Sequence, residues 1–480
     1  KNNIINLEIN EIFPSLIKEY ISSSFKKKSA LCKLSSQNLL EIYSTKALDI
    51  PKKDLYPSQT WASFNTGKSF DQHKCYWYSD DLDCKNLIWS NLTSLNFDVG
   101  IVGSLHSSKF PEDLFKNKHY KFYIPDCFSN KDLTKPKKYK WFQSLNNSLV
   151  GDSGRVTGIS NLISKLISFL PKILINPKSF GISLFSIKML IKILKFTIKT
   201  RNKEFLRTAQ FPLIASIFID LYIKHKPKYS TLFSNHVAGN LHRYMYAYKK
   251  NNYKSKNKYS KNWINQNKNA IYFSIELLDD LINEILNKKD FKETTILITS
   301  SMGQEPSENF SDKKLAKYDG KIEKIDLFIK ELIKYQIKYY SLDVDYIHEK
   351  NMAPQYGFRI KNNHEINYEL IKSSINSFFI SIGLQGKVDI NGVSIVISLD
   401  PYLDKNLQKN LDIDQAKKKF SKYGMIFFPI NDHHSGSHNP EGIFAVINPT
   451  INLSKNLKKN IDKDGSINYL NFKKIILNSL

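Results

Sequence analysis

Short apolar runs alternate along this chain with longer stretches of helical periodicity. Residues 4–9, 97–102, 121–124 and 294–299 are short runs dominated by apolar, β-branched and aromatic side chains. Such runs are typical of strands buried on both faces of a parallel sheet. Between them, apolar residues recur at helical spacing, most regularly over residues 275–286. The alternation predicts an α/β domain in which crossover helices join parallel strands.

A different pattern occupies residues 153–226. Apolar residues recur there at helical intervals without intervening strands, for example at Leu166 and Leu170, which predicts two or three amphipathic helices with basic faces. We therefore expect an N-terminal part of the α/β core over residues 1–152, a helical insertion over 153–226, and a C-terminal part of the core over 227–480. We interpret the insertion as a cap packed on the core; a helix lying in a membrane interface is the alternative.

Three further strands are predicted in the C-terminal part, at residues 378–382, 386–390 and 393–398. The Asn391-Gly392 pair between the last two is a strong hairpin signal, because both residue types tolerate the positive φ angles of a tight turn. The chain shows no internal repeat.

Composition narrows the classes of partner and compartment. The net charge is +26, which favours an anionic substrate by steering. Lysines are spread along the chain rather than gathered in one arm, so we expect no specific nucleic-acid binding. Lysines also interrupt the most apolar stretch, residues 159–198, which argues against a transmembrane segment.

The cysteines point to a reducing compartment. The four cysteines form no CxxC pair, which argues against a zinc knuckle. Scattered thiols in a chain of this length suit the cytoplasm. The chain begins at Lys1 rather than at Met, so a removed leader stays open, and the oligomeric state is not determined.

Candidate chemistry is densest in residues 431–449. His433, His434 and His438 lie within six residues, beside Gly436. Neutral imidazole is the commonest metal ligand, and a glycine lets the backbone fold tightly around an ion or a phosphate. The segment predicts a metal or phosphate site on a loop leading into a strand; a solvated polar loop is the alternative.

Other polar residues follow the predicted strands, where ligands of an open parallel sheet bind. They supply a carboxylate, hydroxyls and imidazoles: Glu8, Thr60, Asn235, His236, His242, Ser300, Ser301 and His438. This set is what metal-assisted attack by a hydroxyl on a phosphate or sulfate ester requires. Arg243 has the fork geometry that suits phosphate oxygens, and Thr60 could also be a helix N-cap.

The order of these residues resembles the alkaline phosphatase superfamily, nearest its type I phosphodiesterase/nucleotide pyrophosphatase branch. Glu8 matches the metal-binding Asp that ends the family's first strand, and Thr60 matches the nucleophile, followed by the element Thr66-Gly67…His73. Gly436-Ser437-His438 matches the final G-x-H. The resemblance covers most of the chain outside the helical insertion. It implies a three-layer α/β/α core with a mostly parallel sheet and a helical cap.

One motif departs from the family. The run TSSMGQ, residues 299–304, aligns with the strand that ends in S-D-H-G, so Ser301-Met302 stands where the family has Asp-His. Serine is a poor metal ligand and methionine suits only soft metals. The number of bound metal ions, whether one, two or none, is therefore not determined by the sequence.

The resemblance also implies roles for individual residues. Thr60 would be the catalytic nucleophile on an anionic phosphate- or sulfate-ester substrate. A divalent metal, with zinc favoured, would be held by Glu8, His242 and His438, with His236 and Asn235 as weaker candidates, while Arg243 and His434 would contact the substrate. The implied function is a metal-assisted hydrolase or transferase. The alternatives are a catalytically inactive binding or assembly protein on the same fold and a protein that binds polyanions or membranes through its charge.

Overall fold

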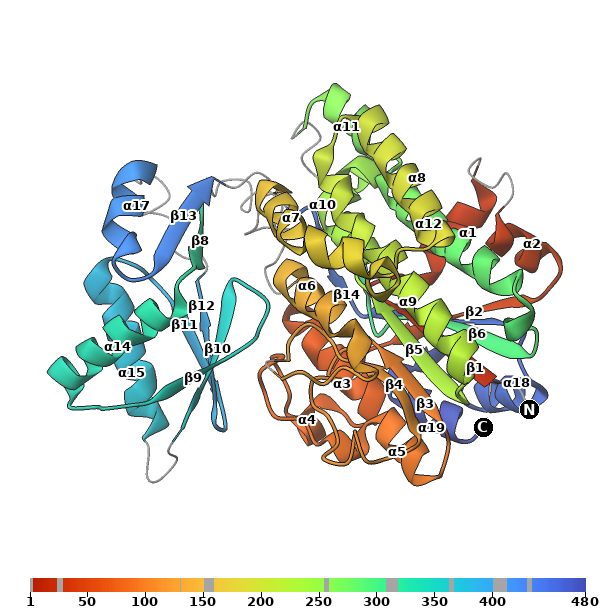
Figure 1. The fold of residues 1–480 in the computed structure, drawn as a ribbon, viewed down its shortest axis with the longest axis horizontal. Helices are drawn as coiled ribbons and strands as arrows, with labels where there is room; N and C mark the ends of the chain where they lie inside the picture. The colour runs from red at the N-terminus through yellow and green to blue at the C-terminus, as the bar shows by residue number, and fades with distance from the viewer. Residues whose placement is uncertain are drawn as a thin grey trace.

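The computed structural model describes residues 3–23, 29–129, 131–150, 159–253, 259–307, 318–361, 367–399, 412–429 and 434–480. Its centre is an eight-stranded sheet with the order β16-β2-β15-β6-β1-β5-β3-β4 (Figure 1). The strands are β1 (Asn3–Ile9), β2 (Leu40–Lys46), β3 (Val99–Val102), β4 (Tyr120–Ile124), β5 (Tyr229–Ser234), β6 (Thr294–Thr299), β15 (Glu441–Ile447) and β16 (Ser466–Asn468). Strand β15 is antiparallel to both neighbours, and the other neighbouring pairs are parallel. The predicted α/β class with a mostly parallel sheet is confirmed.

Helices cover both faces of this sheet, so the core has three layers. Successive side chains of a strand point to opposite faces: Ile5, Leu7 and Ile9 pack in one apolar cluster, and Ile4 packs in the other. The first cluster is covered by α1 (Pro14–Ser22), α2 (Ala30–Ser36), α6 (Lys140–Val150), α9 (Gln210–His225), α10 (His236–Tyr248) and α12 (Ala270–Leu286). The second is covered by α3 (Pro57–Thr66), α5 (Ile88–Ser94), α18 (Ile451–Lys459) and α19 (Phe472–Leu477). Two short helices, α4 (Phe70–His73) and α11 (Lys261–Asn267), lie at the periphery.

The helical insertion divides into a core helix and two outer helices. Helix α9 belongs to the core, since its Phe211, Ile214 and Phe218 are fully buried. Helices α7 (Ile159–Ile175) and α8 (Leu184–Thr200) pack outside it. Among the described residues, Lys203–His225 is long and apolar enough to cross a membrane by length and composition, but 61% of its apolar window is buried inside the protein.

Residues 318–429 form a second lobe that the sequence did not separate from the core (Figure 1). It has its own apolar cluster and a four-stranded sheet in the order β11-β12-β10-β9, beside the pair β13-β8. Its elements are β8 (Tyr318–Ile322), α14 (Ile325–Tyr340), β9 (Tyr346–Glu349), β10 (Gln355–Ile360), α15 (Tyr368–Ile382), β11 (Lys387–Asn391), β12 (Ser394–Ser398), α17 (Ile413–Ser421) and β13 (Met425–Pro429).

The strand predictions in this lobe are partly confirmed. The hairpin at Asn391-Gly392 is present between β11 and β12, with Gly392 at φ +57°. Residues 378–382 are the end of helix α15, not a strand. Buried residues of α15 recur at helical spacing: Ile371, Ile375, Phe378 and Ile382. This spacing over the whole segment determines its structure, and the short apolar run at its end does not.

Candidate metal centre

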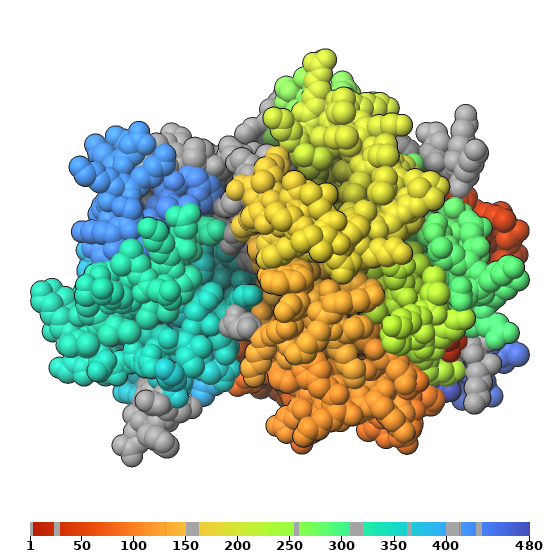
Figure 2. Space-filling view, in the orientation of Figure 1, coloured from red at the N-terminus to blue at the C-terminus, as the bar shows by residue number. Residues whose placement is uncertain are grey.

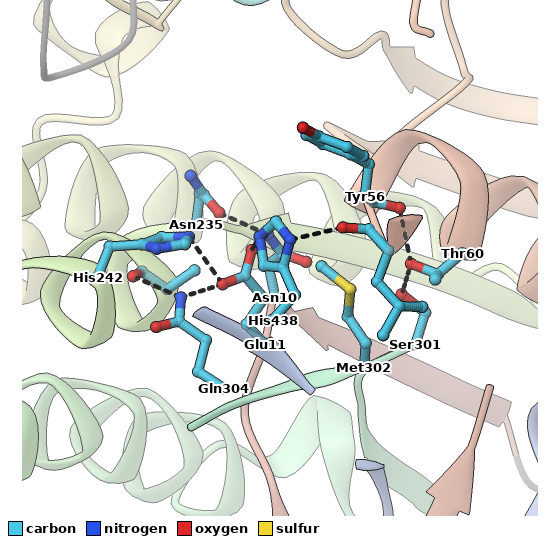
Figure 3. Close-up of polar contacts among 12 residues, drawn as sticks. Asn10, Glu11, Tyr56, Thr60, Asn235, His242, Ser301, Met302, Gln304 and His438 are labelled. Carbon is cyan, nitrogen blue, oxygen red and sulfur yellow. Dashed lines mark hydrogen bonds and ion pairs between the residues drawn. The ribbon is translucent and has the colours of Figure 1, made fainter. Parts of the chain in front are cut away.

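Three side chains from distant segments meet beyond the carboxyl end of β1 (Figure 3). Glu11 follows β1, His242 lies on α10, and His438 lies on β14 (Gly436–Asn439), which pairs with β7 (Gly303–Pro306). Their possible ligand atoms all lie within 4.8 Å of one another. Glu11 Oε2 is 3.0 Å from His242 Nε2, and Glu11 Oε1 is 3.5 Å from His438 Nε2. Two imidazoles and one carboxylate are the donor set of zinc sites that keep a fourth position open.

The Glu11 carboxylate is held from several sides. The side chain is 2% exposed. Asn10 Nδ2 donates to Glu11 Oε1 at 3.1 Å, and Gln304 Nε2 donates to Glu11 Oε2. The Glu11 backbone N–H donates to Ser300 Oγ at 2.8 Å, and the residue has φ +62°. A non-glycine residue in this left-handed region costs energy and persists only where its surroundings fix it, which is common at functional sites.

The two histidines have a strong electrostatic effect on this carboxylate. Burial alone would raise the pKa of Glu11, but the His242 and His438 imidazoles beside it hold that pKa well below its usual range. Glu11 is therefore ionised over the whole physiological range, as a metal ligand must be.

His438 is oriented by groups behind it. Its Nδ1 lies 2.6 Å from the Leu55 carbonyl oxygen, and its ring meets the Tyr56 ring at 5.8 Å in an edge-on contact. A Nδ1–H donated to a backbone carbonyl fixes the tautomer in which Nε2 is free to bind a metal. His242 stacks on His434, with 5.0 Å between the ring centroids.

Gly436 is needed for packing rather than for contact with an ion. A Cβ on Gly436 would lie 2.2 Å from Gln304 Oε1 and 2.9 Å from the Leu241 carbonyl oxygen. The missing side chain lets β14 approach β7 and α10 closely. A side chain at this position would displace Gln304 and crowd the Leu241 backbone of α10, the helix that carries His242.

Thr60 lies next to this group, in the first turn of α3 (Figure 3). Its Oγ1 is 2.8 Å from Ser301 Oγ and 3.3 Å from the Tyr56 carbonyl oxygen. The side chain is fully buried. Thr60 is not an N-cap, because Tyr56 holds that position.

Glu8 is placed away from the two histidines, contrary to its expected position. It lies inside β1, and its neighbours are Asn6, whose Nδ2 donates to Glu8 Oε1 at 3.3 Å, and Ser104. A side chain within a strand points to a face of the sheet rather than beyond its end, and Glu8 shares the face of Ile4, which is covered by α3. Burial raises the pKa of Glu8 to about 8. The structure thus groups Glu11, and not Glu8, with His242 and His438.

The weaker metal candidates have other partners. Both ring nitrogens of His236 are engaged, Nδ1 with Ser234 Oγ at 2.7 Å and Nε2 with the Ser274 carbonyl at 3.1 Å. Its ring stacks on Phe211, and burial lowers its pKa to about 3, so His236 is a core residue. Asn235 Oδ1 accepts from Asn10 Nδ2 at 2.7 Å and so supports the group indirectly.

The two residues predicted to contact the substrate, Arg243 and His434, lie beside His242. Arg243 is buried, and its Nη1 donates to the Gly239 carbonyl of the same helix at 3.2 Å. His434 reaches the group through its stacking on His242. His73 bonds to Ser63 Oγ at 2.8 Å, away from this group. His433 lies outside the described residues.

Sequence reasoning missed Glu11, Asn10 and Gln304. The signal for Glu11 was present: β1 ends at Ile9, so the residues beyond its carboxyl end are Asn10 and Glu11. Gln304 carried no such signal, because its role depends on the pairing of β7 with β14.

Comparisons with known proteins give structural likenesses only. No family model and no curated protein matches the chain. Similar solved structures are phosphonoacetate hydrolase from Sinorhizobium meliloti 1021 (10% identity, 100% of this chain and 96% of that chain, TM-score 0.36) and murine ectonucleotide pyrophosphatase/phosphodiesterase 5 (9%, 99% and 94%, 0.36). A third is Thermus thermophilus alkaline phosphatase (7%, 100% and 91%, 0.39). At such identities and TM-scores, we draw the function from the site geometry alone.

Proposed function

We propose that this protein is a metal-dependent hydrolase or transferase of phosphate (or sulfate) esters, with a single divalent ion, zinc by its donor set, held by Glu11, His242 and His438. The observation that carries the proposal is the convergence of these ligand atoms within 4.8 Å. The donor set fits a metal, because one carboxylate is ionised and His438 presents Nε2 through its bond to Leu55. A divalent ion there would supply a Lewis acid that polarises an ester oxygen and lowers the pKa of a nearby hydroxyl.

Within this proposal, Thr60 is the nucleophile. Its support is position: the residues that precede α3, Leu55 and Tyr56, contact His438, and Thr60 lies one turn further along. The helix N-terminus favours the negative charge of a bound ester. Neither of its two oxygen partners, Ser301 Oγ and the Tyr56 carbonyl, is a base at neutral pH. Because Thr60 is fully buried, substrate access requires that the side chains over it move.

Metal content is the first test. Purified wild-type protein should bind about one zinc ion per chain by elemental analysis. Glu11→Gln should reduce zinc affinity at least about 100-fold, because loss of a ligand should cost no less than the roughly 10–100-fold that residues behind the ligands contribute. Glu305→Gln is the matched control, since Glu305 lies on β7 and instead pairs with Lys52 and Asn439. Equal zinc binding by wild type and Glu11→Gln would refute the site.

Turnover is the second test. Aryl phosphomonoesters, phosphodiesters and sulfates should identify the substrate, and Thr60→Ala should lower kcat by at least about 1,000-fold if Thr60 forms the covalent intermediate. Thr66→Ala is the control, because Thr66 lies on the same helix, is buried, and donates to the Ala62 carbonyl at 2.7 Å. Zinc-dependent turnover that survives in Thr60→Ala would show that Thr60 is not the nucleophile, and it would still support the metal site.

One observation favours a second candidate, a binding protein without catalysis. Met302 is fully buried and packs in the apolar cluster that includes Trp61, and it stands where the resembled family has a metal-binding His. Zinc binding at Glu11 without turnover of any of the three ester classes would favour this candidate.

We also propose a reducing compartment and an anionic substrate. All four cysteines are free thiols, in keeping with a reducing compartment such as the cytoplasm. The net charge of +26 favours an anionic substrate. Neither property distinguishes phosphate from sulfate.

A further inference from the structure

Helix α8 has two apolar faces, and only one of them is used by the fold. Met189 and Ile193 are buried against the core. On the other side, an apolar stripe recurs at intervals of three and four residues and faces solvent: Leu184, Ile187, Ile191, Leu194 and Ile198. A helix of a globular protein normally has a polar face opposite its buried one. The outer stripe of α8 is therefore unexplained by folding.

Helix α7 repeats this arrangement. Leu166, Phe169 and Ile173 pack against the core, while an outer set is exposed: Ile163, Ile167, Leu170, Leu174 and Ile175. The ten outer residues of both helices are 42–84% exposed. Helices α7 and α8 lie on the same face of the molecule, in gold and yellow in Figure 2. Exposed apolar residues gathered in this way mark a surface that contacts something else.

The charge of this surface has one sign. Between residues 159 and 203 the chain has no Asp or Glu and nine basic residues: Lys165, Lys172, Lys178, Lys188, Lys192, Lys195, Lys199, Arg201 and Lys203. Lys192 pairs with Glu276 and Asp280 of α12 and so attaches α8 to the core. Lys188, Lys195 and Lys199 are exposed; Lys188 and Lys195 lie one turn from residues of the apolar stripe, and Lys199 directly follows Ile198.

An exposed tryptophan lies beside α7. Trp141 of α6 is 42% exposed, and Lys172 Nζ lies 3.7 Å from its ring centroid. Tryptophan and lysine with apolar stems are the side chains that occupy the boundary between lipid headgroups and acyl chains.

We propose that the outer faces of α7 and α8 bind the surface of an anionic lipid membrane, with the aliphatic stripe inserted among the acyl chains and the lysines at the headgroups. Amphipathic helices with this combination of aliphatic and basic residues lie in the membrane interface. Nucleic acid fits less well, because bases are bound by stacking on aromatic rings and the stripe is aliphatic. The inference is independent of the metal centre.

Vesicle co-sedimentation tests the proposal with the full chain. Wild type should bind vesicles of equal parts phosphatidylcholine and phosphatidylglycerol and not vesicles of phosphatidylcholine alone. The double variant Ile191→Gln/Leu194→Gln should weaken binding roughly 100-fold, at roughly tenfold per side chain. Its control is Ile337→Gln/Ile380→Gln, two exposed residues of the second lobe, which should bind as wild type does.

Two double variants with the same change in net charge distinguish binding by this surface from binding through the overall charge of the protein. Lys188→Glu/Lys195→Glu should weaken binding at least about 25-fold, at roughly fivefold per lysine lost. Lys455→Glu/Lys459→Glu changes the net charge equally at exposed positions of α18 and should have little effect. Circular dichroism melting confirms that all variants fold.

Several outcomes would overturn the proposal. These are absence of vesicle binding, equal loss in the α18 control, or equal binding to phosphatidylcholine alone. Salt-dependent binding to duplex DNA that only the α8 lysine variant loses would assign the surface to nucleic acid. Self-association by light scattering that Ile191→Gln/Leu194→Gln abolishes, without lipid binding, would assign it to a second copy of the chain.

Discussion

Replacing Glu8 by Gln should stabilise the protein at neutral and alkaline pH relative to acid pH. Glu8 is fully buried between the sheet and α3, and among the described residues its Oε2 has no hydrogen-bond partner. Burial raises its pKa to about 8, and the Ser104 hydroxyl opposes this only in part. Gln has nearly the shape of the protonated acid and can accept from Asn6 as Glu8 does. It removes the ionisation and places an amide N–H₂ where the acid has an O–H.

The direction of the pH effect follows from linkage. The unfolded chain ionises Glu8 near pH 4.5, whereas the folded protein keeps it protonated up to about pH 8. Between these values the unfolded state binds fewer protons, so stability falls as pH rises. At about 1.4 kcal/mol per pH unit, wild type should lose about 4 kcal/mol relative to Glu8→Gln between pH 4 and pH 8. For a chain of this length that is roughly 4 °C in Tm.

The assay is thermal unfolding of both proteins at intervals from pH 4 to pH 8, followed by metal analysis. The difference in Tm between wild type and variant isolates Glu8 from the other titrating groups. Glu323→Gln, at an exposed position, should show no such trend. A pH-independent difference would refute the raised pKa of Glu8, and loss of bound zinc in Glu8→Gln would show that Glu8 is a metal ligand, as the sequence suggested.

Two further predictions concern glycine packing and a half-buried ion pair. Gly100→Ala should destabilise the protein by about 2–3 kcal/mol, because its Cβ would lie 2.1 Å from the Phe122 ring. Gly239→Ala, whose nearest neighbour is Arg243 Nη1 at 3.4 Å in a helix, should instead stabilise by up to about 1 kcal/mol; urea unfolding compares the two, and equal destabilisation would contradict the account. Lys192→Ala should cost about 1 kcal/mol through loss of its half-buried pairs with Glu276 and Asp280, while Lys195→Ala should be neutral by thermal melting.

The apolar pattern of the sequence located β1, β3, β4 and β6 of the central sheet, but not β2, β5 or β16. The predicted strand over residues 294–299 coincides with β6, and those over residues 4–9 and 121–124 coincide with β1 and β4 to within one residue. A strand buried on both faces is apolar at most positions, so its signal is local. The same pattern did not separate the second lobe, because a boundary between two apolar clusters depends on which elements contact each other.

The residues of the candidate site were likewise predicted only in part. The sequence by itself located His242 and His438, since a cluster of histidines after a strand or on a helix is visible residue by residue. It also chose Glu8, because the resemblance matched this residue to the family's metal-binding Asp, although the predicted strand ends at Ile9, as β1 does. Only the tertiary structure determined that Glu8 is buried between the sheet and α3 and that Glu11, held by Asn10, Gln304 and Ser300, completes the group. Sequence specifies which donors exist; which of them share one point depends on strand register and on contacts between segments that lie hundreds of residues apart.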